Sequence, residues 1–337
     1  MAGGGRALIL GASGFLGGHI AEKLVAAGRP VRAFVRPTSN VERIEGLPIE
    51  IVHGDGFDGD AVAAAMDGCD TVFHCIVDTR AWLRDGRPLY RTNVDALKVA
   101  MDAALKAGIG RFIFASTVVT IGRTSGRAAN EADEFNWWGD AIDYVKSRAI
   151  AERAFLEYCR TRGLPGVALC ITNTYGPGDI QPTPQGRMIA MAAAGQLNIY
   201  YDGGFPSVGI EDVADAMILA ETEARLGERY IISDRVVSWK DLLEIAARQA
   251  GRDVKMRKVS LPILYASAFI ADLIARLRGR DSQLSVKSIR ISRSIGELSS
   301  EKARRELGWN PRPVEESIRK AADFYEARRK AMEQAHG

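Results

Sequence analysis

Short apolar runs alternate with segments of helical periodicity through the first half of the chain, and this alternation limits the fold more than any other feature. The runs are short and rich in β-branched residues, which is typical of buried strands. Between them, apolar residues recur four positions apart, as Leu97, Met101 and Leu105 do. This order predicts a parallel sheet with helices on both faces and right-handed crossovers. The predicted strands are residues 7–10, 31–35, 50–52, 71–75, 112–115 and 167–170.

After about residue 176 the alternation ends, and proline-marked loops lead into a mostly helical carboxy-terminal third. We therefore expect an α/β fold: a Rossmann-type doubly wound parallel sheet with a smaller, mostly helical carboxy-terminal region that binds substrate. Residues 229–232 again resemble a strand of the main sheet. The expected boundaries are 1–176 for the Rossmann domain, with 205–235 returning to it, and 177–204 plus 236–337 for the substrate-binding lobe.

The composition excludes several classes of protein. The 337 residues include 45 Lys and Arg against 42 Asp and Glu, and a net charge of +3 gives no electrostatic footprint for nucleic acid. The cysteines at 69, 75, 159 and 170 lack the spacing of a metal site or a disulfide framework, so no metal is expected. Because the first strand begins within ten residues of Met1, we expect no signal peptide and a cytoplasmic protein.

A glycine-rich turn follows the first predicted strand and opens the first predicted helix. Such a turn lets the backbone approach a pyrophosphate, whose charge is stabilised by the N–H groups at the start of the helix. The spacing is Gly-x-x-Gly-x-x-Gly, and close packing of helix on strand is the alternative explanation. The predicted dinucleotide contacts in this turn are Gly11, Ser13, Gly14, Phe15, Leu16 and Gly17.

The end of the second predicted strand favours NADPH over NADH. NAD-preferring folds place an acidic residue there to bind the ribose 2′-hydroxyl, whereas this chain has Arg36, with Thr38 and Ser39 just after it. A guanidinium binds a 2′-phosphate through paired hydrogen bonds. An exposed arginine at the start of a loop is the alternative. Asp55, after the third strand, is expected either to accept from the adenine amino group or only to shape a turn.

In the order of its motifs, nearly the whole chain resembles the extended short-chain dehydrogenase/reductase superfamily, close to its dihydroflavonol-reductase-like branch. Each motif is modestly specific alone, but their order is highly specific. The motifs are the glycine-rich turn and residues 72–74, 91–94, 114–117, 144–148, 173–178 and 302–309.

The resemblance implies the catalytic residues. In that family a tyrosine is the general acid or base, a serine or threonine polarises the substrate carbonyl, and a lysine four residues after the tyrosine binds the nicotinamide ribose. Carried over by position, Tyr144 is the acid and Thr117 the carbonyl partner, with Ser116 as the adjacent alternative. A nearby cation is expected to lower the tyrosine pKa from its ordinary value near 10 toward neutrality.

This chain departs from the pattern at the position of the lysine, where it has Arg148. Residues four apart share a helix face, so Arg148 can still contact Tyr144 and the ribose, whereas Lys146 points elsewhere. Arginine supplies the same positive charge as lysine but does not release a proton. Catalysis by Tyr144 is therefore expected with altered geometry. The alternative is a degenerate protein in which Arg148 is a surface residue.

The resemblance places three further residues, Ile171, Thr172 and Asn173, against the cofactor. The preceding Cys170 is expected to be a small core residue, because no histidine nearby in the sequence could activate it as a nucleophile. His74 is likewise expected in the core or in the cofactor wall, not as a catalytic base.

Aromatic residues near the catalytic tyrosine are the predicted substrate contacts. Trp137 and Trp138 precede Tyr144 on a loop, where two indoles can form the wall of a site for a bulky apolar molecule, although helix packing explains them equally well. Tyr175 is the third predicted substrate-binding residue.

An apolar segment with a basic flank lies in the carboxy-terminal third, at residues 261–277. This combination is typical of a protein that touches an anionic membrane or draws a lipid from it. A buried helix followed by a solvated loop is the alternative. The flanking cations are Arg278, Arg280, Lys287, Arg290 and Arg293.

These features together favour an NADPH-dependent reduction of a ketone on a large apolar molecule, with a 3-keto-sphingoid or oxidised ceramide as the best-fitting substrate. The Tyr-x-x-x-Arg spacing resembles bacterial ceramide (oxidised sphingolipid) reductases. A nucleotide-sugar epimerase or dehydratase is the alternative enzyme, and a protein that senses NADPH without turnover is the alternative from another class. Relatives often dimerise through helices corresponding to residues 89–106 and 143–161, so a homodimer is an option.

Overall fold

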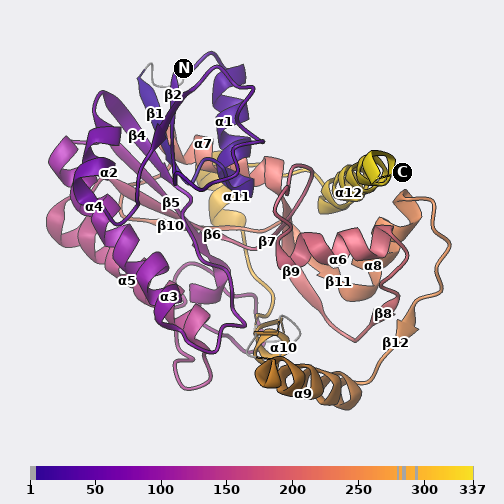
Figure 1. The fold of residues 1–337 in the computed structure, drawn as a ribbon. Helices are drawn as coiled ribbons and strands as arrows, with labels where there is room; N and C mark the ends of the chain where they lie inside the picture. The colour runs from indigo at the N-terminus through magenta and orange to yellow at the C-terminus, as the bar shows by residue number, and fades with distance from the viewer. Residues whose placement is uncertain (1–4, 279–280, 283–285, 293–294, 337) are drawn as a thin grey trace.

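Seven parallel strands form the central sheet of the computed structural model, which describes residues 5–278, 281–282, 286–292 and 295–336 (Figure 1). Their order across the sheet is β10-β6-β5-β4-β1-β2-β3, and every pairing is parallel. The predicted Rossmann-type fold is confirmed. The strands are β1 (Arg6–Leu10), β2 (Val31–Val35), β3 (Glu50–His53), β4 (Cys69–His74), β5 (Arg111–Thr117), β6 (Gly166–Ile171) and β10 (Arg229–Ile232).

Helices cover both faces of this sheet, each over its own apolar cluster. The inner strands are buried on both sides, which explains why they read as continuous apolar runs in the sequence. The helices on one face are α1 (Phe15–Ala26), α7 (Ile210–Thr222) and α11 (Glu301–Leu307), and those on the other are α2 (Gly59–Met66), α4 (Ala96–Ala107) and α5 (Asp143–Arg162).

The turn between β1 and α1 depends on two of its glycines. Gly11 has a φ of +86°, a conformation that other residues rarely adopt. At Gly17, a Cβ atom would lie 2.4 Å from the carbonyl oxygen of Gly11, so the helix can approach the strand this closely only without a side chain. The motif therefore sets the position of the amino-terminal end of α1 beside the sheet.

A second lobe is built on a three-stranded sheet, with its own apolar core. Its central strand, β9 (Gly204–Gly209), pairs in parallel with β7 (Asn173–Tyr175) and antiparallel with β11 (Arg235–Ser238). The sequence predicted that the chain returns to the Rossmann domain at residue 205. Because β9 belongs to this second sheet, the chain instead returns at α7. The helices of the lobe are α6 (Pro184–Ala193), α8 (Trp239–Gln249) and α12 (Val314–His336).

Two helices on one side of the molecule, α9 (Leu261–Leu277) and α10 (Val286–Ser292), follow the short pair of strands β8 (Ile199–Tyr200) and β12 (Arg257–Lys258) (Figure 1). Among the residues that the structure describes, no helix is both long and apolar enough to cross a membrane.

A π-helical turn lies near the carboxyl ends of the central strands. It spans Arg91–Asp95, between α3 (Arg87–Tyr90) and α4, and each of its hydrogen bonds closes over one more residue than in an α-helix. The wider turn carries the buried Asn93. The amide of Asn93 accepts from the backbone N–H of Asp78 at 2.8 Å and donates to its carbonyl oxygen at 3.1 Å. The loop after β4 is thereby fixed to the helix layer.

Candidate active site

Three polar side chains, Tyr144, Arg148 and Glu152, follow one another at intervals of four along α5. This spacing puts them on one face of the helix. That face packs against the ends of β5 and β6, since all three residues interact with groups on these strands. The site is therefore built where one helix crosses the carboxyl edge of the sheet, where ligands bind in open α/β folds.

The tyrosine and the threonine predicted for catalysis are in contact. Thr117 ends β5, and its side chain lies close enough to the phenol of the partly buried Tyr144 to lower the pKa of that phenol. The alternative partner, Ser116, points away from the phenol, because its hydroxyl donates to the carboxylate of Glu152. The structure thus brings Thr117 to Tyr144 and assigns Ser116 to a different hydrogen bond.

Arg148 is a buried cation and not a surface residue. Its exposed fraction is 2%. The guanidinium lies over the ring of Phe114 at 5.2 Å, and its Nη2 donates to the carbonyl oxygen of Ala115 at 2.6 Å. Within the described residues, Nε and Nη1 have no hydrogen-bond partner. Burying two donors without acceptors lowers the stability of the folded protein. Such unsatisfied groups are typical of positions that bind a ligand.

Burial raises the pKa of Tyr144 above its ordinary value. The positive charge of Arg148 and the hydrogen bond with Thr117 act in the opposite direction, and the nearby charge of Asp78 adds to the rise. The sequence predicted a pKa lowered toward neutrality by the cation. In the structure the loss of hydration around the phenol outweighs the cation, so the phenol is protonated at neutral pH.

Glu152 is a site residue that the sequence analysis missed. Its buried carboxylate accepts from Arg229 at 2.7 Å, Thr120 at 2.8 Å and the Cys170 thiol at 3.2 Å, besides Ser116. These partners come from β10, from the turn after β5 and from β6, so one carboxylate joins three segments beneath the site. Its position four residues after Arg148 could have shown that it shares a helix face with Arg148. The pairing with Arg229, 77 residues further along the chain, could not be read from the sequence.

Asp78 and Asn93 were also missed as site residues. Asn93 donates to the hydroxyl of Ser147 at 3.0 Å, and this hydroxyl donates to the backbone oxygen of Tyr144 at 2.8 Å. Since Asn93 also binds the backbone of Asp78, it joins the loop after β4 to the first turn of α5. The sequence shows Asn93 within a motif but gives no signal for Asp78.

The glycine-rich turn fits a pyrophosphate. Gly14 precedes the first residue of α1 and is exposed, and without a side chain it leaves the N–H groups of the first helical turn open to an anion. Ser13, Phe15 and Leu16 are partly buried around it, and Gly17 is buried against the turn. These residues would hold the pyrophosphate of a nicotinamide dinucleotide, and the two unpaired donors of Arg148 would bind its ribose.

The residues predicted to bind the adenosine end lie on the surface. Arg36 is exposed directly after β2, and Ser39 is partly buried, with its backbone N–H donating to the Arg36 carbonyl at 2.9 Å. Asp55 is exposed, and its carboxylate accepts from the backbone N–H of Phe57 at 3.0 Å. Asp55 therefore shapes a turn in this structure, and contact with an adenine stays a prediction.

The segment after β6 is held tightly against β10. Ile171 and Thr172 are buried, and the hydroxyl of Thr172 donates to the Ile232 carbonyl at 3.1 Å. Asn173, partly buried, accepts from Gln185 at 3.2 Å. Their contact with a cofactor stays a prediction.

Cys170 and His74 lie in the core, as expected. Burial and the charge of Glu152 raise the pKa of the Cys170 thiol well above its ordinary value, so the thiol is not ionised at neutral pH. Burial and the charge of Arg148 lower the pKa of His74 to about 3. The neutral His74 ring stacks on Phe112 at 5.9 Å.

The three predicted substrate contacts do not meet at Tyr144. Trp137 is 7% exposed and packs in an apolar cluster with Val119 and Val145, which corresponds to the packing alternative. Tyr175 is 2% exposed, and its ring belongs to the apolar core of the second lobe. Core packing occupies both side chains, and Tyr144 itself packs against the cluster of Trp137. Contact of either residue with a substrate stays a prediction.

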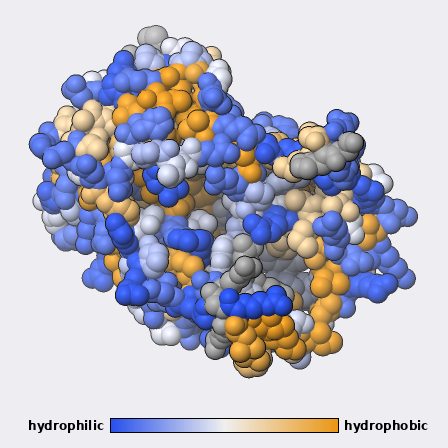
Figure 2. Space-filling view, viewed as in Figure 1, coloured by the Kyte–Doolittle hydropathy of each residue, from blue (hydrophilic) through white to orange (hydrophobic). Residues whose placement is uncertain are grey.

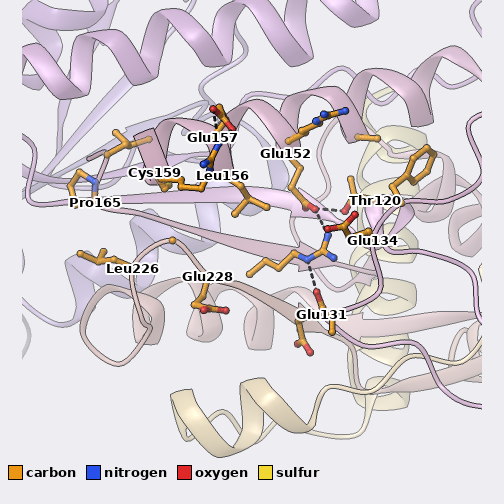
Figure 3. Close-up of a pocket in the computed structure, with 18 of the residues that line it drawn as sticks. Thr120, Glu131, Glu134, Glu152, Leu156, Glu157, Cys159, Pro165, Leu226 and Glu228 are labelled. Carbon is orange, nitrogen blue, oxygen red and sulfur yellow. Dashed lines mark hydrogen bonds and ion pairs between the residues drawn. The ribbon is translucent and has the colours of Figure 1, made fainter. Parts of the chain in front are cut away.

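Trp138 instead lines an open cavity of about 1020 Å³ alongside α5 (Figure 3). The lining includes Glu152 and Leu226 but neither Tyr144 nor Arg148. In Figure 3 the carboxylate of Glu152 points toward Thr120, at the end of the cavity near the site. Glu152 thus separates this cavity from the catalytic pair.

Comparison with known proteins agrees with this geometry. Residues 7–233 match the model of the NAD dependent epimerase/dehydratase family. A putative dihydroflavonol 4-reductase of Synechocystis sp. is 28% identical, with 94% of each chain covered. A 2-alkyl-3-oxoalkanoate reductase of Stenotrophomonas maltophilia is 29% identical over 93% of this chain and 97% of that protein. Among solved structures, gox2253 superposes with a TM-score of 0.83 at 32% identity, covering 96% of this chain and 98% of the other.

Replacing Arg148 with methionine is expected to stabilise the ligand-free protein, because the change removes a buried charge with two unpaired donors. We expect the free energy of unfolding, measured by urea denaturation, to rise by about 1 kcal/mol. Arg29→Met is the matched control, since Arg29 is also buried but pairs with Glu221 and Asp70. Arg29→Met should lower the free energy of unfolding by about 3 kcal/mol or more. Equal destabilisation by both changes would contradict the unpaired state of Arg148.

Proposed function

The chain belongs to the NAD-dependent epimerase/dehydratase family, and from this membership we propose that it is a reductase that uses NADPH to convert a ketone on a large apolar molecule into a secondary alcohol. The observation that carries the proposal is the contact between Tyr144 and Thr117, with the buried guanidinium of Arg148 one helical turn behind the phenol. An acid, a hydrogen-bond donor and a fixed cation are the groups that carbonyl reduction requires.

Each residue has a distinct task in this reaction. The bound nicotinamide supplies the hydride. Thr117 donates a hydrogen bond to the substrate carbonyl oxygen, and Tyr144 transfers its phenolic proton to the same oxygen as negative charge develops there. The charge of Arg148 stabilises the phenolate that remains. The unpaired Nε and Nη1 donors of Arg148 would bind ribose hydroxyls, which would supply the acceptors that these two donors lack.

The state of Tyr144 favours the direction of reduction. A phenol with a raised pKa already holds its proton at neutral pH, so it can act as an acid without a preceding ionisation. Oxidation of an alcohol would need the phenolate as a base, and burial disfavours that form.

The choice of NADPH rests on the residues that follow β2. Arg36 is exposed there and free to move toward a 2′-phosphate, and the next acidic residue along the chain is Glu42. Glu42 is paired with Arg328 at 2.7 Å, on α12, so it is not available to a ribose hydroxyl. This arrangement supports recognition of the phosphate and not of the free hydroxyl.

The choice of an apolar ketone rests on the relatives. One is named for reduction of a 2-alkyl-3-oxoalkanoate, which carries a ketone between alkyl chains. Within this class we favour a 3-keto-sphingoid or oxidised ceramide, because its ketone also lies near the head of a long-chain lipid. A nucleotide sugar is the alternative substrate, and stoichiometric NADPH binding without turnover of any ketone would instead favour a sensing role.

Replacing Tyr144 with phenylalanine should lower kcat for ketone reduction by about 10²-fold or more, because no other described phenol contacts Thr117. The assay follows NADPH oxidation at 340 nm with a 3-keto-sphingoid, beside simple aldehydes and a nucleotide sugar. Tyr158→Phe on the same helix is the control, since the Tyr158 hydroxyl lies 3.5 Å from Asp102, away from the site. Undiminished turnover in Tyr144→Phe would assign the proton to another group.

The raised pKa of Tyr144 sets the pH dependence. Reduction uses the protonated phenol, so its kcat should stay level from neutral pH to about 9 and fall only as the pH approaches the tyrosine pKa near 10 or above. Oxidation of the product alcohol uses the phenolate and should rise over the same range. A reduction rate that falls between pH 6 and 8 would show that a different group is the acid.

Replacing Arg36 with serine should raise the KM for NADPH by about tenfold or more, because a bidentate contact to phosphate is lost. The KM for NADH should stay within about twofold, which makes the second cofactor the internal control. Parallel increases for both cofactors would show that Arg36 does not read the 2′-phosphate.

A further inference from the structure

The exposed face of α9 is apolar along its whole length. Its largest exposed side chains are Phe269 at 63%, Ile263 at 59% and Leu277 at 81%. The opposite side of the helix packs inward through the buried Ala268. Ser267 also lies on the exposed face, and its hydroxyl donates to the Ile263 carbonyl at 2.9 Å, within the helix. Three more large apolar side chains complete the face: Ile270, Leu273 and Ile274.

Positive charge is concentrated on the same part of the chain. Residues 255–293 contain nine Lys and Arg and two Asp, a formal net charge of +7, so the remaining residues carry a net −4. Lys255 and Arg257 are exposed just before α9, and Arg278 is exposed just after it. Arg280 and Arg293, which the sequence analysis included in this basic flank, lie outside the described residues. The net charge of +3 is therefore the sum of a strongly positive segment, residues 255–293, and a remainder that is negative overall.

The segment that follows α9 is joined to the loop after β4. Lys287 of α10 donates to the Leu83 carbonyl at 2.9 Å, and Arg84 pairs with Asp281 at 3.0 Å. Leu83 and Arg84 belong to the loop after β4, whose Asp78 acts electrostatically on Tyr144. Figure 2 shows the apolar surface of α9 at the lower edge of the molecule, beside hydrophilic residues and below the hollow between the two lobes.

We propose that α9 docks the protein on an anionic lipid bilayer, with its apolar face in the acyl chains and the flanking cations at the headgroups. An apolar stripe bracketed by Lys and Arg suits such an interface, and the positive region meets negative lipid while the rest of the protein is repelled. In this orientation the loop after β4 faces the membrane. The docking rests on the proposed function in one respect: a keto-lipid would pass from the bilayer to Tyr144 along this side.

Vesicle flotation of the purified full chain tests the docking. We expect the protein to float with vesicles that contain phosphatidylglycerol, and at least about tenfold less with phosphatidylcholine alone. Phe269→Glu should lower binding to the anionic vesicles by about tenfold or more, because it places a charge in the apolar layer. Lys255→Glu with Arg257→Glu should abolish the preference for anionic lipid. The assay contains neither ketone nor NADPH, so its outcome does not depend on the reductase proposal.

Leu226→Glu is the matched control, because Leu226 is also a large apolar residue, 54% exposed, on the turn between α7 and β10. It should float like the wild type. Wild-type protein that stays unbound to both kinds of vesicle would overturn the proposal. Light scattering that shows a dimer, abolished by Phe269→Glu, would overturn it too, since a second copy would then cover the face.

Discussion

The buried carboxylate of Glu152 is the interaction on which the catalytic side of the molecule depends. It receives hydrogen bonds from β6, from β10, from the end of β5 and from the turn after β5, and it lies on the same helix face as Tyr144. A carboxylate in such a place is tolerated only because these donors replace its hydration. The position of α5, and with it the position of the phenol, follows from that requirement.

Arg148 shows the opposite condition, a buried charge whose donors are only partly satisfied. The fold accepts the unfavourable desolvation of this group because the Phe114 ring and one backbone carbonyl compensate part of it. Sites that bind ligands often retain such local instability, since a fully satisfied cation would have no donor left for the ligand. Glu152 and Arg148, one turn apart, thus differ: the carboxylate is fully hydrogen-bonded and holds the helix, whereas the guanidinium keeps two donors unpaired.

The sequence was sufficient for the parts of the protein that depend on local pattern. The central strands, the glycine-rich turn and the spacing of Tyr144 and Arg148 could all be read from periodicity and order, because each is fixed by neighbours in the chain. What it could not show depends on distant partners. The raised pKa of Tyr144 follows from burial, the role of Glu152 follows from contacts with β6 and β10, and the core positions of Trp137 and Tyr175 follow from packing.

The π-helical turn at Arg91–Asp95 makes the site sensitive to the number of residues in the chain at this point. A turn of this kind holds one residue more than an α-helical turn. Removing one residue there would rotate Asn93 away from both Asp78 and Ser147, and the loop after β4 would lose its anchor to α5.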